Sequence, residues 1–116
     1  MEARAVKKNV RMSPRKVRLV VDQIRGKSVN DAHAILQFSK KAAAEPIQKT
    51  LNSAVANAQD RAQDQDDWVD ADDLRVREAY VDEGWTLKRF RAGAMGRAKP
   101  RDRRASHITI VVDTEE

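Results

Sequence analysis

The sequence predicts an α+β domain in which three helices pack on a small three-stranded antiparallel sheet, with a long protruding β-hairpin. Three observations predict it. Apolar residues alternate with polar ones near both ends of the chain and again after its middle, as in half-buried strands. Apolar residues recur at helical spacing between the strand near the start of the chain and the strand after its middle. A basic run with glycines near its centre separates the last two strands, which suits a hairpin tip.

The first strand is predicted over residues 3–12, and a helix follows it directly. Ser13 can accept hydrogen bonds from the free N–H groups of that helix. Pro14 suits its first position, because proline has the required φ and no N–H to leave unpaired. Gly26 ends the helix. The residues predicted to face the core are Val6, Val10 and Met12 in the strand and Val17, Val20, Val21 and Ile24 in the helix.

Two further helices are predicted. Ser28 caps a short one, with Asp31 three residues later in an arrangement similar to a capping box. The longest helix runs roughly over Lys41–Ala62, and Pro46 leaves two alternatives open: the helix begins near Glu45, or it bends at the proline. The predicted inward residues are Ala32, Ile35 and Leu36 in the short helix and Ile47, Leu51, Ala54, Val55 and Ala58 in the long one.

An acidic loop is predicted over residues 60–73, where seven aspartates stand against a single arginine. A calcium loop of the EF-hand type needs a glycine at its sixth position and a glutamate at its twelfth. Neither a suitable glycine nor a glutamate occurs here, so we interpret the loop as solvated and Trp68 as its anchor on the domain. The inward residues of the two strands that follow are predicted to be Leu74, Val76, Tyr80, Ile108, Ile110 and Val112.

A basic hairpin is predicted at about 84–104, and the globular body of a single 116-residue domain at about 1–83 and 105–116. The hairpin could be a solvated surface loop, but ordinary surface segments mix charges of both signs. An arginine-rich ribbon suits a polyanion, above all nucleic acid. The basic residues are Lys88, Arg89, Arg91, Arg97, Lys99, Arg101, Arg103 and Arg104, and the predicted tip is Ala92, Gly93, Ala94, Met95 and Gly96.

A second basic patch is predicted near the start of the chain, where residues 1–27 carry nine positive and two negative charges. Residues 28–83 carry six positive and twelve negative charges, so the basic blocks indicate one face for a polyanion. In the hairpin, Phe90 either stacks on a base or packs across the ribbon. The nucleic-acid contacts predicted outside the hairpin are Arg4, Arg11, Arg15, Lys16, Arg18 and Arg25.

The composition excludes several kinds of site. Without cysteine, the chain has no disulfide, zinc ribbon or thiol chemistry. His33 and His107 are not placed near a carboxylate pair or a nucleophile, and the sequence contains no Gly-rich phosphate loop or nucleophile elbow. We expect no metal, no cofactor and no catalysis. No apolar stretch approaches the ~20 residues of a membrane span and no signal peptide opens the chain, so we expect a cytoplasmic protein without a membrane partner.

Two other functions stay open on this pattern. The first two helices could mimic a helix-turn-helix that binds DNA. Against this, the exposed side of the second helix offers Asn30, Asp31, His33 and Gln37 rather than basic side chains. The other alternative is a small nuclease or other enzyme, which the missing catalytic constellation disfavours.

Four segments resemble the bacterial form of the large-subunit ribosomal protein twenty-two family, and the resemblance covers the chain from Arg4 to Val112. The segments are MSPRKVRLVVD followed by IRG at 12–26, SAVANA at 53–58, VDEG and TLKRF at 81–90, and SHITIVV at 106–112. The resemblance implies three helices, a three-stranded sheet and a long hairpin that lines the polypeptide exit tunnel, near the macrolide-binding region. It implies as partners large-subunit ribosomal RNA, neighbouring large-subunit ribosomal proteins and the nascent polypeptide.

The hairpin departs from the family pattern at two places. Trp85 stands where the family usually has a proline, and the stretch Ala92–Ala98 lacks a proline and two basic side chains that are usual there. Contacts that those family side chains make cannot be carried over to Gly93 or Met95. We therefore expect a tip that is less positive and more pliable than is usual for the family.

Overall fold

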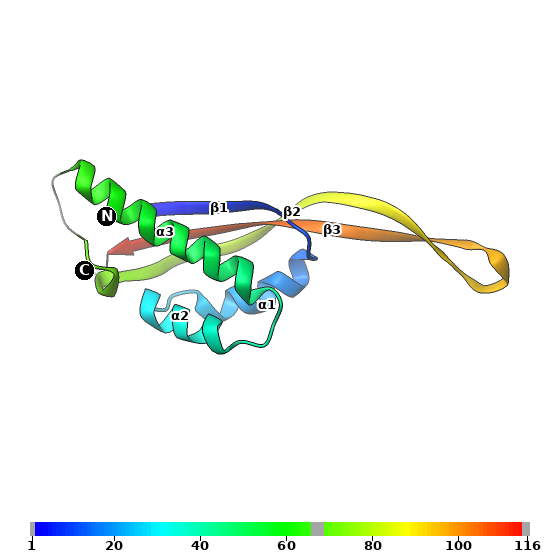
Figure 1. Cartoon of the computed structure of the whole chain (residues 1–116), viewed down its shortest axis with the longest axis horizontal. Helices are drawn as coiled ribbons and strands as arrows, with labels where there is room; N and C mark the ends of the chain where they lie inside the picture. Colours follow the sequence, from blue (N-terminus) through cyan, green and yellow to red (C-terminus); the bar gives the residue numbers. More distant parts are fainter. Residues whose placement is uncertain (1, 66–68, 115–116) are drawn as a thin grey trace.

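The chain forms a three-stranded sheet that is drawn out at one end into a long ribbon (Figure 1). The computed structural model describes residues 2–65 and 69–114. Short 3₁₀ turns precede β2 and form the hairpin tip, at Ala71–Asp73 and Ala94–Gly96. The other elements, in chain order, are β1 (Ala3–Val10), α1 (Pro14–Ile24), α2 (Val29–Phe38), α3 (Ala44–Asp64), β2 (Leu74–Ala92) and β3 (Ala98–Thr114).

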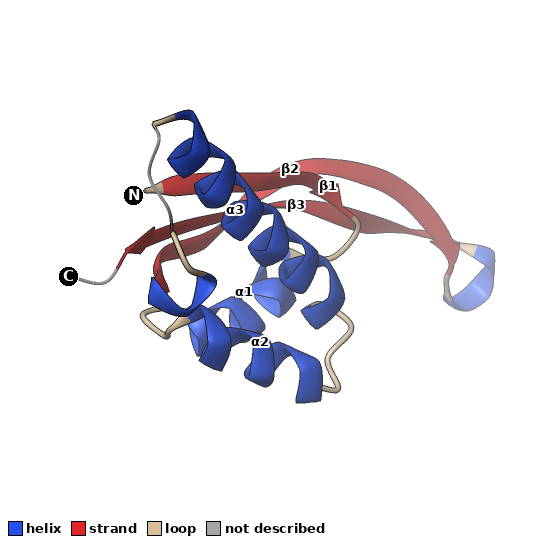
Figure 2. Cartoon of the chain, turned by 60° about the vertical axis from the view of Figure 1, so that its left-hand side comes forward, coloured by secondary structure: helices blue, strands red, loops and turns tan. Residues whose placement is uncertain are grey.

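The predicted α+β fold is confirmed. The strand order is β1-β3-β2, so β3 is central and pairs antiparallel with both neighbours. The three helices lie on one face of this sheet (Figure 2). Beyond the end of β1, only β2 and β3 continue, and the molecule is therefore 66 Å long but 27 and 17 Å in its other dimensions. Its radius of gyration of 17.4 Å exceeds the ~13 Å of a compact domain of this length.

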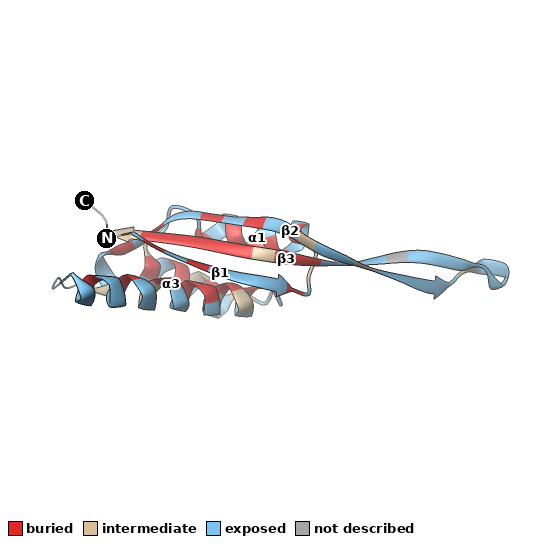
Figure 3. Ribbon diagram, turned by 90° about the horizontal axis from the view of Figure 1, so that it is seen from above, coloured by how far each residue is buried: buried red, intermediate tan, exposed pale blue. Residues whose placement is uncertain are grey.

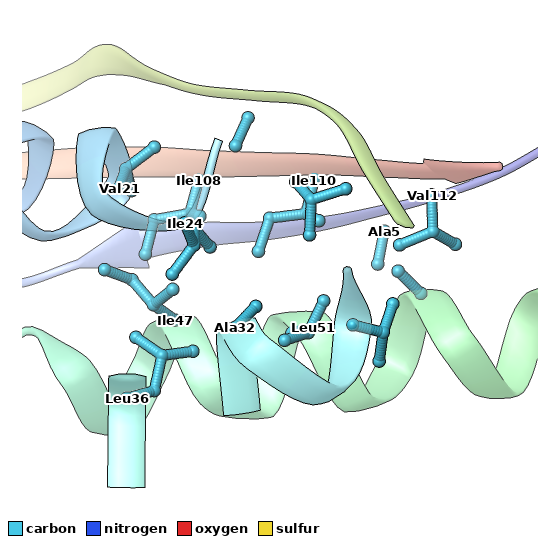
Figure 4. Packing of buried hydrophobic residues seen from close by; sticks show 14 of the residues in the cluster. Ala5, Val21, Ile24, Ala32, Leu36, Ile47, Leu51, Ile108, Ile110 and Val112 are labelled. Atoms are coloured by element: carbon cyan, nitrogen blue, oxygen red, sulfur yellow. The ribbon is translucent and has the colours of Figure 1, made fainter. Parts of the chain in front are cut away.

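The core lies between the helices and the inward face of the sheet. In its centre, Ile47 and Leu51 of α3 pack with Ile24 of α1 and with Ile108 and Ile110 of β3 (Figure 4). All five side chains are fully buried. Burial stops where the body ends, and the ribbon beyond it is almost wholly exposed (Figure 3). The core therefore positions the base of the hairpin and gives no support to the rest of it.

The predicted helix starts are confirmed. Ser13 Oγ accepts a hydrogen bond from the Lys16 N–H at 3.4 Å, and Ser28 Oγ accepts one from the Asp31 N–H at 3.2 Å. Each bond satisfies an N–H that has no partner within its helix. α3 begins two residues before Pro46, so the proline lies in the first turn, where it removes no helical hydrogen bond. Of the two alternatives for this helix, the start near the proline is correct.

The predicted loop over 60–73 is wrong in its length. α3 continues to Asp64, and Ala71–Asp73 form a 3₁₀ turn. The longer helix follows from the apolar stripe, because Ala62 is buried one turn after Ala58 and extends the packed face. The prediction for Trp68 lies outside the described residues.

The predicted inward face of β1 is wrong at Val6, which is exposed. Ala3 and Ala5 face the core instead, on the opposite parity. The pairing with β3 then becomes irregular before Val10, where Asn9 adopts a left-handed conformation with φ of 63°. This irregularity reverses the alternation, so Val10 is buried as predicted although Val6 is not.

The prediction for Tyr80 in β2 is wrong for the same physical reason. The register with β3 shifts between Val76 and Glu78, where β2 has one extra residue. Beyond this bulge the inward residues are Ala79 and Val81, both buried, and Tyr80 turns to the outer face.

Candidate nucleic-acid interface

The hairpin presents its basic side chains on a ribbon that no other element covers. The paired arms run from Thr86 opposite Arg104 to Ala92 opposite Ala98. Within the described part of the chain, no basic side chain of the hairpin forms an ion pair. The side chain of Arg101 lies outside that description. The exposed basic residues are Lys88, Arg89, Arg91, Arg97, Lys99, Arg103 and Arg104.

The tip is a tight turn that needs both of its glycines, as predicted. The Gly93 N–H donates to the Arg97 carbonyl oxygen at 2.5 Å, and a Cβ added at Gly93 would come within 2.8 Å of that oxygen. Gly96 has φ of 75°, a conformation that costs glycine little. Between them, Met95 is also left-handed, with φ of 59°, and its side chain is 99% exposed. The middle residue of the tip turn thus exposes an uncharged thioether and not a cation.

A hydrogen-bonded network ties the root of the hairpin to the end of β1. Trp85 Nε1 donates to Asn9 Oδ1 at 2.9 Å, and the Asn9 N–H donates to His107 Nδ1 at 3.1 Å. The strands approach closely here, because a Cβ added at Gly84 would lie 3.1 Å from the Ala105 carbonyl oxygen. Sequence reasoning missed this network, since 98 residues separate Asn9 from His107. Its one visible signal was Trp85 in place of the usual proline.

A groove of about 740 Å³ lies between the root of the hairpin and the start of α1, and we call it the root groove. It joins the two basic patches that the sequence predicts, because its cations come from both. Trp85, Leu87 and Phe90 add apolar surface, and Asp102 is its one carboxylate. The cations that line the root groove are Arg11, Lys16, Arg89, Arg103 and Arg104.

Two of the predicted RNA contacts, Arg18 and Arg25, bind the edge of the sheet. Arg18 donates through Nε and Nη2 to the Val81 carbonyl oxygen, at 3.2 and 2.8 Å. Arg25 donates through the same two atoms to the Ala79 carbonyl oxygen, at 3.0 and 2.7 Å. β2 is an edge strand, so in this stretch no further strand pairs with these carbonyl groups. The two guanidinium groups supply the hydrogen bonds that a fourth strand would otherwise make.

The opposite edge of the sheet is covered by α3. Asn57 Nδ2 donates to the Arg4 carbonyl oxygen at 3.0 Å, and Arg61 Nη1 donates to the Glu2 carbonyl oxygen at 2.7 Å. The Arg4 side chain lines a separate hollow of about 620 Å³ that it shares with several carboxylates. The structure therefore does not bring Arg4 to the root groove, whereas Arg15 lies exposed on α1, near its start.

Replacing Arg25 with alanine is expected to lower the free energy of unfolding by about 1–2 kcal/mol, because two charged hydrogen bonds to the part-buried Ala79 carbonyl group and the exposed ion pair with Asp22 are lost. Urea denaturation measures this loss. Arg15→Ala is the matched control, since Arg15 is exposed on α1, the helix that Arg25 directly follows, and has no ion pair or side-chain hydrogen bond to another described residue. That variant should lose less than about 0.5 kcal/mol. Equal losses in the two variants would contradict the edge-binding role of Arg25.

The histidines and carboxylates of the described residues form no metal-binding group. Burial lowers the pKa of His33, so this imidazole is mostly neutral at neutral pH. No group of three or more potential metal ligands gathers in residues 2–65 and 69–114. Among the helices of that same part of the chain, none has the length and apolar character needed to cross a membrane.

Comparison with known proteins decides the family. The family model described as ribosomal protein L22p/L17e matches residues 5–113, which is nearly the whole chain. The chain belongs to this family. The family consists of ribosomal proteins and not of enzymes, so the expectation of a non-catalytic protein is confirmed and the nuclease alternative is set aside.

Curated relatives are similar in sequence to this chain over nearly their full length. The large ribosomal subunit protein uL22 of Desulfitobacterium hafniense (strain DSM 10664 / DCB-2) is 58% identical over 111 residues, covering 96% of this chain and 93% of its own. The protein of the same name from Bifidobacterium longum (strain DJO10A) is 52% identical over 116 residues, covering 100% and 98%. The one from Oceanobacillus iheyensis is 53% identical over 112 residues, covering 97% and 95%. The resemblance to the bacterial form of this family is thereby confirmed.

Proposed function

We propose that this chain is a structural constituent of the large ribosomal subunit that binds large-subunit ribosomal RNA, supports its folding and assembly, and lines the polypeptide exit tunnel with its hairpin. The observation that carries the proposal is a two-stranded ribbon, uncovered by the body, whose described cations lack ion-pair partners. An isolated two-stranded ribbon is at best marginally stable in water. A polyanion that matches the guanidinium groups would order it.

Phosphate contacts account for most of the binding that we propose. Arginine presents a rigid fork of donors that matches phosphate oxygens, and each neutralised phosphate releases counterions. Such contacts fix the position of the protein, and shape recognition dominates because duplex RNA hides the base edges of its deep groove. The proposed RNA contacts are Arg4, Arg11, Arg15, Lys16, Arg18, Arg25, Lys88, Arg89, Arg91, Arg97, Lys99, Arg101, Arg103 and Arg104, of which Arg18 and Arg25 have part of their donors occupied within the protein.

The tip residues 92–96 are proposed to face the nascent polypeptide. Support comes from the resemblance of the hairpin to that of the family and from the exposed, uncharged Met95 at its end. The body would contact neighbouring large-subunit ribosomal proteins as well as RNA. The protein would work in the cytoplasm, as part of the ribosome.

The test is hydroxyl-radical probing of large-subunit RNA transcripts with the purified protein. A shortened variant replaces residues 88–102 with a two-residue Asn-Gly turn, which removes the outer ribbon and keeps the root. The turn fits because Leu87 and Arg103, the residues that it joins, are cross-strand partners in the native register. The intact protein should protect a discrete set of RNA positions, and the shortened variant should lose a subset of them. Absence of protection, or identical protection by both proteins, would contradict the proposal.

A further inference from the structure

We propose that the root groove binds one unpaired RNA nucleotide, with its base stacked on the indole ring of Trp85 and its phosphates held by the surrounding cations. The proposal rests on the RNA binding proposed above. It goes further in specifying a place where the protein holds a base and not only the phosphate backbone.

The ring of Trp85 is a fixed platform. Its only polar atom, Nε1, is already satisfied by Asn9 Oδ1 at 2.9 Å, and Asn9 is in turn held by its N–H bond to His107. Trp85 is nevertheless 43% exposed as a residue and lines the groove. An indole that is held in this way keeps its π-face for a partner and loses little conformational entropy when the partner stacks on it.

Phe90 is a second aromatic residue that lines the same groove. The sequence left open whether this ring packs across the ribbon, but it is 77% exposed, with Pro100 as its cross-strand neighbour. Packing across the ribbon thus leaves most of the ring uncovered. Exposed aromatic rings among arginines are the composition with which proteins hold unstacked bases of single-stranded RNA.

The size and charge of the root groove fit a nucleotide. Its volume of about 740 Å³ lies within the ~300–1,000 Å³ of small-ligand sites. Its five cations have no ion-pair partner among the described residues. Asp102 would repel a bare phosphate, but its carboxylate can accept a hydrogen bond from the amino group of adenine, cytosine or guanine. The groove therefore favours a ligand that combines phosphate with a base over phosphate alone.

The ligand must be unpaired for steric reasons. In a duplex both faces of a base are covered by its neighbours in the stack, so stacking on Trp85 requires a nucleotide from a loop, a bulge or a single strand. A peptide of glutamates would satisfy the cations but has no aromatic ring to stack on the indole.

Fluorescence of Trp85 tests the stacking directly. Trp68→Phe leaves Trp85 as the only tryptophan, and this full-length variant is titrated with hexa-adenylate, a 12-base-pair RNA duplex, tripolyphosphate and hexaglutamate. Hexa-adenylate should quench the emission and the other three should not. Quenching by the duplex, by tripolyphosphate or by hexaglutamate to the same extent as by hexa-adenylate would overturn the proposal.

Substitutions of Trp85 and Phe90 distinguish stacking on a base from the anchoring of the hairpin root through the Trp85–Asn9 hydrogen bond. Trp85→Leu should weaken binding of labelled hexa-adenylate roughly 5- to 100-fold, and Trp85→Phe should restore most of the affinity because phenylalanine still stacks. Trp85→Phe also loses the bond to Asn9, so an affinity as low as that of Trp85→Leu would show that Trp85 serves only as an anchor. Phe90→Leu leaves the anchor intact and should weaken binding several-fold; unchanged affinity would remove Phe90 from the site.

Binding of large-subunit RNA by the same proteins distinguishes this proposal from the one on which it rests. If Trp85→Leu binds that RNA as the unaltered protein does and hexa-adenylate does not quench Trp85, the nucleotide site is wrong and RNA binding stands. If the unaltered protein fails to bind that RNA, the proposed function itself is wrong.

Discussion

Replacing Arg89 and Arg91 together with alanine is expected to weaken binding to large-subunit ribosomal RNA roughly 30- to 150-fold at about 0.1 M salt. Both side chains are exposed on the hairpin, and each lost phosphate contact is taken as worth about 1–1.5 kcal/mol. The salt dependence should also flatten. The slope of log K against log salt should fall in magnitude by about 1.5, because each phosphate contact contributes roughly 0.7–0.9. Filter binding at four or five salt concentrations measures both quantities.

The control for this pair removes the same charge from elsewhere in the molecule. Lys27 and Arg75 are exposed and lie at the end of the body opposite the hairpin. Arg75 is there the cross-strand partner of Asp113 in the β2–β3 register. Lys27→Ala combined with Arg75→Ala should leave RNA affinity nearly unchanged, because only the distant, screened field of the protein is altered. If both double variants weaken binding equally, net charge and not the hairpin determines the affinity.

The largest expected effect on stability comes from Leu51→Ala. Leu51 is fully buried on α3 in the centre of the core. Its truncation should lower the free energy of unfolding by about 3 kcal/mol, within the ~2–5 kcal/mol of such changes, because a cavity replaces apolar contacts. A domain of this size has ~5–15 kcal/mol in all, so the variant should remain folded but with a clearly lower denaturation midpoint in urea.

Leu19→Ala is the matched control, because it is the same chemical change on another helix. Leu19 is 58% exposed on α1, and alanine is at least as good a helix former as leucine. The expected change in the free energy of unfolding is within about 0.5 kcal/mol. A loss of 2 kcal/mol or more at Leu19 would mean that α1 buries more surface than the structure shows.

The helices were predictable because their signals are local. Ser13 with Pro14, and Ser28 with Asp31, mark starts through contacts within one turn, and the apolar stripes follow from a fixed period. The strand faces were not fully predictable. An irregular residue at Asn9 and another between Val76 and Glu78 each reverse the alternation, and no residue type in those segments requires them.

The candidate site was predictable in its charge but not in its geometry. A basic hairpin and a basic first helix are visible as composition, and the structure brings both to the root groove. What the side chains contact depends on residues far apart in the chain: Arg18 reaches the carbonyl group of Val81, 63 positions away, and Trp85 reaches Asn9, 76 positions away. Periodicity carries no information about such pairs, so Arg18 and Arg25 could not be distinguished in advance from Arg15.

The side chains that cover the two outer strands stop where the globular body stops. Beyond it, both margins of the ribbon offer unpaired peptide groups, which are a template for strands from another copy. Copies that are not yet assembled are kept apart by the mutual repulsion of their like charges, and salt screens that repulsion. The isolated protein should thus self-associate through its ribbons as ionic strength rises.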